Sequence, residues 1–89
     1  MTFALGRLVA TPGALAAMEK SGESPTAFLG RHAAGDWGDV DVEDRRSNDL
    51  AVIEGTRILS AYRTRRGDKL WVITEADRSA TTLLLPEEY

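Results

Sequence analysis

The spacing of apolar residues changes near residue 56, which divides the chain into a helical part and a strand part. Between residues 12 and 54, apolar side chains recur every three or four positions, as in helices that bury one face. Three later stretches are rich in β-branched, aromatic and aliphatic residues, which favours strands: RILSAYRT (57–64), KLWVITE (69–75) and SATTLLLP (79–86). The intervals RRGD and ADR between them have the composition of hairpin turns. The pattern predicts an antiparallel meander after a helical region.

Capping residues divide the helical part into three helices. Thr-Pro at 11–12 and Ser-Pro at 24–25 each combine an N-cap side chain with a proline at the first helical position, where its missing N–H is tolerated. A glycine about ten residues after each proline suits a helix C-terminus. A third helix is expected at residues 42–54, before Gly55. Its predicted core-facing side chains are Val42, Leu50 and Ile53.

The order of these elements predicts a fold class. FALGRLVA (3–10) is typical of a short strand that could join the meander as its fourth member. Three helices followed by three strands indicate a single α+β domain over residues 1–89. We expect the N-terminal strand and three short helices to pack on one face of an antiparallel three- to four-stranded β-meander. The first or the last strand could pair with a second copy at a sheet edge, which would make a homodimer.

Composition narrows the classes of protein to which the chain can belong. Hydrophobic residues make up 43% and charged residues 28%, as in folded globular proteins. The chain has no cysteine, which excludes a disulfide framework and fits the cytoplasm, where we expect the protein. Its apolar runs are far shorter than the roughly 20 residues that cross a bilayer, so we expect no membrane association. A net charge of −3 disfavours general nucleic-acid binding and leaves only local basic patches for it.

Acidic residues are concentrated in the stretch GDWGDVDVED (35–44), before the third helix. The positive end of a helix dipole favours carboxylates there, and Asp39 or Asp41 is the expected N-cap. A calcium loop does not fit, because Asp44 and Leu50 stand where such a loop needs glycine and a bidentate glutamate. We therefore expect no metal site. Trp37 within this stretch either closes the core or serves as an exposed aromatic anchor for a partner.

Basic residues form a second charged region on the first strand of the meander and its hairpin. Such charges can simply keep an exposed hairpin soluble, or they can bind carboxylates or phosphates through the guanidinium fork. Together with the acidic stretch they make the molecule electrically bipolar, which suits docking onto a protein partner. The candidate binding residues are Trp37, Arg63, Arg65, Arg66, Asp36 and Asp39.

The single histidine offers a catalytic alternative. His32 lies four residues after Phe28, so both share a helical face, and His32 is either a hydrogen-bonded core residue or a general acid or base. Helices followed by a meander are similar in architecture to barnase/RelE-type ribonucleases. In a metal-independent ribonuclease toxin, the candidate catalytic residues would be His32, Arg57, Arg63, Arg78 and Thr82, with Thr81 as an alternative substrate contact. No phosphate loop, nucleophile elbow or dinucleotide fingerprint is present, so no cofactor is expected.

Several phrases of the chain resemble a family of short bacterial proteins found on plasmids and other mobile elements. These phrases are GRLVATPGAL, GDWGDVDVEDRRSND, GTRILSAYRT and LWVITEADRSATTLLLPEEY, and the likeness spans nearly the whole chain. Some relatives carry the label of a type I restriction enzyme modification subunit. A methyltransferase of that kind needs a cofactor-binding doubly wound domain and an (Asn/Asp)-Pro-Pro-aromatic motif, whereas this chain has neither adjacent prolines nor a Gly-x-Gly loop.

The resemblance implies an accessory role for a mobile element, such as blunting host defence or regulating plasmid functions. The sequence thus favours a non-catalytic module that binds a protein partner, as an inhibitor or regulator of a host or plasmid system. The ribonuclease toxin remains the alternative, and binding of nucleic acid without cleavage is a further, less favoured one.

Overall fold

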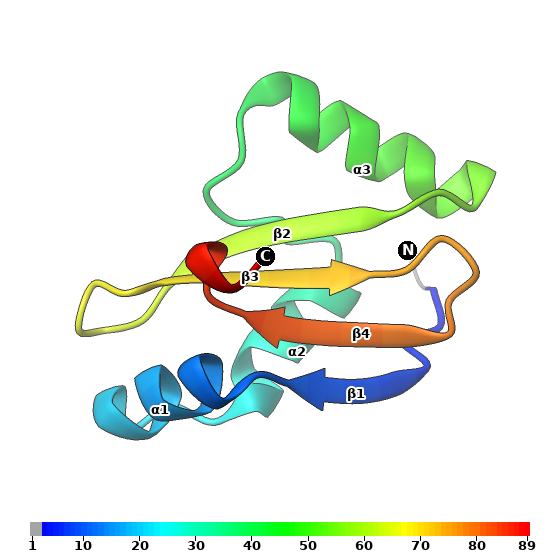
Figure 1. Cartoon of the computed structure of the whole chain (residues 1–89). Coiled ribbons are helices and arrows are strands. Elements are labelled where there is room, and N and C mark those ends of the chain that lie inside the picture. Colours follow the sequence, from blue (N-terminus) through cyan, green and yellow to red (C-terminus); the bar gives the residue numbers. More distant parts are fainter. Residues whose placement is uncertain (1–2) are drawn as a thin grey trace.

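The computed structural model describes residues 3–89 and has an α+β fold, as the sequence predicts (Figure 1). Its elements in chain order are β1 (Arg7–Ala10), α1 (Pro12–Ser21), α2 (Pro25–Ala33), α3 (Val42–Glu54), β2 (Ile58–Arg63), β3 (Lys69–Thr74), β4 (Ala80–Leu84) and the 3₁₀-helix η1 (Pro86–Glu88). The expected side-chain caps are confirmed at Thr11 and Asp41, whose side chains accept hydrogen bonds from the backbone N–H groups of Ala14 and Asp44. Ser24 stands at the N-cap of α2, as expected, but its side chain forms no capping hydrogen bond.

The sheet is mixed, which corrects the expectation of a purely antiparallel arrangement. Its strand order is β1-β4-β3-β2, with the predicted antiparallel meander over β2, β3 and β4, and β1 pairs with β4 in parallel. The meander reverses twice, so β4 runs in the same direction as β2. The three helices return the chain to the end of the sheet where β1 begins, so β2 also runs in the direction of β1. Since β4 is an inner strand, only β1 and β2 have free edges.

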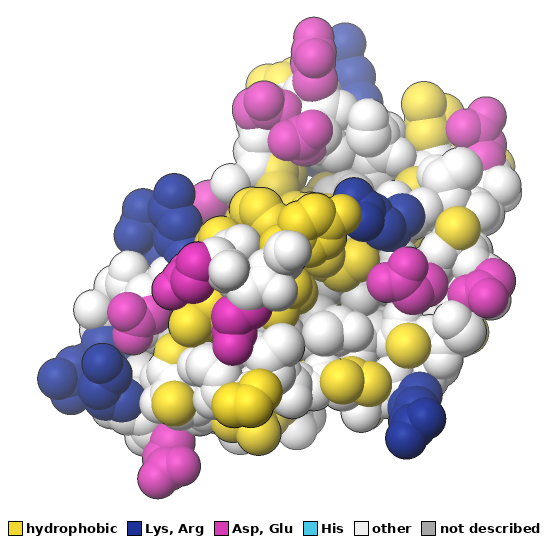
Figure 2. All heavy atoms as spheres, viewed as in Figure 1, with side chains coloured by type: hydrophobic (Ala, Val, Ile, Leu, Met, Phe, Trp, Pro, Cys, Tyr) yellow, Lys and Arg dark blue, Asp and Glu magenta, His cyan; other side chains and the backbone are white. Residues whose placement is uncertain are grey.

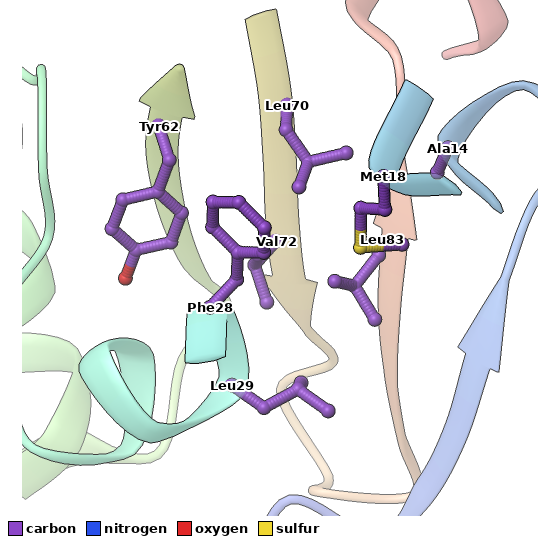
Figure 3. Close-up of a cluster of buried hydrophobic side chains, with 8 residues drawn as sticks. All are labelled: Ala14, Met18, Phe28, Leu29, Tyr62, Leu70, Val72 and Leu83. Atoms are coloured by element: carbon purple, nitrogen blue, oxygen red, sulfur yellow. The ribbon is translucent and has the colours of Figure 1, made fainter. Parts of the chain in front are cut away.

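Helices α1 and α2 cover one face of the sheet and bury the main core against it (Figure 3). Strand alternation turns every second side chain of β2 toward these helices, where Ile58, Ser60 and Tyr62 are all buried. Phe28 of α2 packs beside Tyr62, with ring centroids 5.8 Å apart. The core cluster consists of Ala14, Met18, Phe28, Leu29, Tyr62, Leu70, Val72 and Leu83.

Helix α3 lies alongside the edge strand β2 and not on the face covered by α1 and α2 (Figure 1). The predicted core face of α3 is therefore wrong: Val42, Leu50 and Ile53 are 60%, 54% and 80% exposed. The buried side chains of the helix are instead Asn48 and Ala51. The outer edge of β2 has backbone N–H and C=O groups that need hydrogen-bond partners. The helix face with the polar side chain of Asn48 supplies such partners, which the aliphatic face cannot do.

Two contacts close the free edge of β2. The Asn48 side chain donates from Nδ2 to the carbonyl oxygen of Leu59 at 2.7 Å and accepts from the Leu59 N–H at 3.2 Å. Two residues further along β2, Ala61 forms a parallel bridge with Gly38: the Ala61 N–H donates to the Trp37 carbonyl, and the Ala61 carbonyl accepts from the Asp39 N–H. The outward backbone groups of Leu59 and Ala61 are thereby satisfied, whereas no element of residues 3–89 pairs with the outer edge of β1.

Replacing Asn48 by alanine is expected to lower the free energy of unfolding by about 2 kcal/mol, because two hydrogen bonds disappear and the Leu59 amide group is left without partners. Urea denaturation measures the change. The matched control is Ser47→Ala at the neighbouring exposed position, which should stay within about 0.5 kcal/mol of the parent. Equal stability of Asn48→Ala and the parent would show that the edge of β2 does not depend on this side chain.

Candidate binding surface

The face of the sheet opposite α1 and α2 carries a mixed apolar and basic surface, which we call the outer face. The strand register places the side chains that alternate with the core residues on this side. They are Leu59, Ala61 and Arg63 of β2, Lys69, Trp71 and Ile73 of β3, and Thr82 and Leu84 of β4. Figure 1 shows this face toward the viewer: α1 and α2 lie behind the sheet, α3 lies beside β2, and of the helices in residues 3–89 only the short η1 lies in front.

The C-terminal residues fold back over part of the outer face. Glu88 of η1 accepts hydrogen bonds from the Thr11 hydroxyl at 2.5 Å and from the backbone N–H of Gly13 at 3.1 Å. These bonds, the one from Thr11 above all, lower the pKa of the Glu88 carboxyl. Next to Glu88, the ring of Tyr89 packs against the ring of Trp71 in an edge-to-face arrangement, with ring centroids 5.8 Å apart. Figure 2 shows the resulting apolar patch near the centre of this face, with basic side chains on either side of it.

A cavity of about 330 Å³ opens on this surface, between the hairpin strands and the segment before α3. Its lining combines the carboxylate of Asp39, the cationic side chains of Arg63 and Lys69, and the aromatic ring of Trp71. A smaller cavity of about 220 Å³ follows along β2 under α3, lined by Asp44, Ser47, Asn48, Arg57 and Leu59. The two hollows share strand β2, and their linings combine cationic, hydroxyl and aromatic groups with the carboxylates of Asp39 and Asp44.

Neither Arg63 nor Lys69, the two cationic residues that line the larger cavity, forms a salt bridge within the described part of the chain. Among residues 3–89 the structure shows one salt bridge, between Arg31 and Asp36 at 2.7 Å. Within the described residues, the Arg63 guanidinium donates one hydrogen bond, to the carbonyl oxygen of Gly67 at 3.1 Å. A guanidinium that is bound to a neutral carbonyl keeps its full charge and its other N–H donors, so Arg63 and Lys69 can bind a carboxylate or a phosphate.

His32 lies on the opposite side of the sheet and is completely buried. Its Nδ1 is 2.5 Å from the Ser60 hydroxyl, and its Nε2 is 2.8 Å from the Thr74 hydroxyl. Thr74 in turn contacts the Thr81 hydroxyl at 2.7 Å, and Thr81 donates to the carbonyl oxygen of Leu5.

The direction of this hydrogen-bond chain determines the tautomer of His32. The Leu5 carbonyl can only accept, so the Thr81 hydroxyl donates to it and accepts from Thr74. The Thr74 hydroxyl has then used its proton and accepts from the Nε2–H of His32, which leaves Nδ1 to accept from Ser60. Neutral imidazole satisfies all these groups, and burial lowers the pKa of His32 to about 4. His32 is therefore the hydrogen-bonded core residue, without access to a substrate.

The structure does not bring the candidate ribonuclease residues together. Arg63 and Thr82 lie on the outer face, and the sheet separates them from His32. Arg57 donates to the Tyr89 hydroxyl. Arg78, in the turn between β3 and β4, donates to the carbonyl oxygens at the end of α3, among them that of Ala51 at 2.8 Å. The buried Thr81 belongs to the His32 network.

Asp36 and Asp41 of the acidic stretch form bonds that position the segment before α3, as expected for carboxylates at the start of a helix. Asp36 forms the salt bridge with Arg31, whose hydrogen bond lowers the pKa of the Asp36 carboxyl. Trp37 is 3% exposed and donates from Nε1 to the Asp49 carboxylate, so it closes a second small core and is no exposed anchor. Asp39 alone of the acidic candidates lines the larger cavity.

Arg65 and Arg66 lie at the exposed tip of the β2–β3 hairpin. The backbone N–H of Arg65 donates to the Glu23 carboxylate at 2.8 Å, which attaches the tip to the loop between α1 and α2. This contact leaves both guanidinium groups in solvent. The two arginines extend the basic region of the outer face beyond Arg63.

Sequence reasoning did not single out Lys69, Trp71 and Tyr89 as a group. Alternation along KLWVITE places Lys69 and Trp71 on one side of a strand, and that signal could have found them. The contact of Tyr89 with Trp71 depends on the return of the C-terminal residues, which no local pattern indicates.

Other classes of site are not evident in residues 3–89. No helix in this range has both the length and the apolar character needed to cross a membrane. Within the same residues, no group of three or more His, Asp or Glu side chains is placed to hold a metal ion. Comparisons of the chain with protein-family models, with curated proteins and with solved structures yield no match.

Proposed function

We propose that this chain is a non-catalytic module that binds an acidic segment of a partner protein on its outer face. The observation that carries the proposal is the larger cavity, where Arg63 and Lys69 stand beside the Trp71 ring at an uncovered part of the sheet. Aromatic and arginine side chains are enriched at protein interfaces, and complementary charge guides the encounter. The resemblance to mobile-element proteins supports an accessory role, as an inhibitor or regulator of a host or plasmid system.

A ribonuclease receives less support from the geometry. The only histidine of the chain is buried within a neutral hydrogen-bond network, so the acid–base group of that alternative has no path to RNA. The arginines on the outer face suit phosphate as well as carboxylate, and a bound RNA is therefore an outcome that the experiment must distinguish.

The test is a pull-down with the full chain as bait, followed by mass spectrometry. One partner should dominate with the parent chain, and its recovery should fall by about tenfold or more with the double variant Arg63→Glu/Lys69→Glu, since two attractive contacts become repulsive. Recovery should also fall at high salt, because screening weakens exposed charge pairs. The matched control is Lys20→Glu, which reverses a charge on α1, away from the outer face.

Three results would contradict the proposal. The first is a partner whose recovery is equal with the parent and the double variant, which would locate its binding site elsewhere. The second is cleavage of RNA by the purified chain in the presence of a chelator, which would establish an enzyme. The third is RNA that is bound without cleavage and displaced by salt, which would identify nucleic acid as the ligand of this face.

A further inference from the structure

Helix α3 presents an apolar ridge that nothing in the described part of the chain covers. Val42, Leu50 and Ile53 are each more than half exposed. At 100° per residue these three positions, with Arg46 and Asp49, fall within an arc of about 100° on the helix surface. The buried Asn48 and Ala51 lie on the opposite side of the helix and attach it to β2.

The shape of the molecule makes this ridge accessible. Figure 1 shows α3 along the β2 side of the sheet, apart from α1 and α2, with its far side directed away from the body of the molecule. Leu50 and Ile53 are neighbours on this side of α3, with Val42 one turn beyond Arg46, and exposed aliphatic side chains grouped on one face of a helix mark a candidate interaction surface. A second helix could therefore lie along α3 without meeting the rest of the fold.

The arrangement of residues along the ridge is complementary to itself. In an antiparallel pair of α3 helices with Val42 opposite the partner's Ile53, Arg46 comes opposite the partner's Asp49, and each contact occurs twice. Arg46 has no ion-pair partner among residues 3–89. Asp49 uses one carboxylate oxygen for Trp37, at 3.0 Å, which leaves the other for a partner. A parallel pair would instead oppose Arg46 to the partner's Arg46.

We propose that the ridge of α3, formed by Val42, Arg46, Asp49, Leu50 and Ile53, pairs antiparallel with the same ridge of a second copy of this chain. The dimer has two-fold symmetry, with an apolar contact at each end and two ion pairs between them. One helix pair buries less surface than stable dimers usually do, so the association is concentration-dependent. This surface is separate from the outer face, and the inference does not depend on the proposed function.

The absence of cysteine from the chain permits a direct cross-linking test. In the antiparallel pair, the double variant Val42→Cys/Ile53→Cys places thiols from the two copies opposite each other, and oxidation should convert most of the protein to a covalent dimer on a non-reducing gel. The matched controls are the single variants. Each single thiol lies about 16 Å from its own copy in the partner, beyond the reach of a disulfide, so these variants should remain monomeric. Equal cross-linking of single and double variants would overturn the proposal.

Sedimentation of the unlinked chain provides an independent measurement. The mean mass of the parent should rise from 9.7 kDa toward twice that value as the concentration increases from about 10 µM to about 1 mM. Ile53→Glu and Arg46→Glu should each weaken the association by about tenfold or more, while Lys20→Glu leaves it unchanged. Circular dichroism confirms that each variant is folded.

Other occupants of the ridge would give different results. A parent chain that stays monomeric at about 1 mM overturns the proposal, and a host protein whose capture is lost with Ile53→Glu would then be the occupant. A dimer that persists in Ile53→Glu and Arg46→Glu also overturns it, because the two copies would then pair through another surface.

Discussion

Acidification from about pH 7 to about pH 5 is expected to lower the free energy of unfolding by about 2 kcal/mol, through His32 alone. In the unfolded chain this histidine binds a proton below its ordinary pKa of 6.5, whereas in the folded chain burial lowers the pKa to about 4. Between these values the unfolded state binds more protons, so stability falls as the pH falls. The loss is complete once the pH is below 4, where the folded protein binds the proton as well.

Urea denaturation at the two pH values measures this loss, and two features of the chain make the result specific. His32 is the only histidine, and carboxylates with lowered pKa values, such as Asp36, lose their contribution only at lower pH. The control is His32→Gln, which keeps a polar group in the network but does not titrate. Its stability should change by less than about 0.5 kcal/mol over the same interval. An equal loss in parent and variant would show that His32 is not the titrating group.

Replacing Gly38 by alanine is expected to lower the free energy of unfolding by about 4 kcal/mol. Gly38 has a left-handed φ of +76°, and a Cβ atom at this position would overlap the carbonyl oxygen of Ala61 and the ring of Tyr62. The segment before α3 would have to leave the edge of β2, which breaks the two backbone hydrogen bonds of Ala61.

Gly35→Ala is the matched control for this variant. Gly35, in the same connection between α2 and α3, has a φ of +84°, but its added Cβ would meet only an ordinary contact with Trp37, at 3.9 Å. It should therefore cost about 1–2 kcal/mol from backbone strain alone. Hydrogen exchange at the amides of Asp39 and Ala61 provides a second measurement, since protection there should be lost in Gly38→Ala only. Equal costs for the two variants would show that the approach of Gly38 to β2 is unimportant.

Local interactions explain why much of the secondary structure was predictable. The caps at Thr11 and Asp41 and the end of α3 before Gly55 depend on side chains within three or four residues of the helix ends. The strands of the meander follow from alternation and from their short turns. Each of these features is stabilised by groups that are neighbours in the sequence, and a local pattern is sufficient to indicate them.

The position of α3 could not be predicted in the same way. Its three large aliphatic residues favour a buried face, yet the edge of β2 selects the face with Asn48 because Leu59 has unpaired backbone groups. The parallel pairing of β1 with β4 likewise depends on where the helices return the chain. The candidate site shows the same limit: His32 and Arg63 were grouped by chemistry, and the sheet places them on opposite sides.

By itself, the sequence determined the three α-helices and four strands, their order, the α+β class and the use of the acidic stretch at a helix start. Only the tertiary structure decided that His32 is a neutral core residue, that Trp37 is buried, and that Arg63, Lys69 and Trp71 share an open cavity. The physical reason is the range of the interactions. The backbone groups at helix ends and in turns are hydrogen-bonded by residues a few positions away in the sequence. The burial and the pKa of a side chain depend instead on which distant segments pack against it.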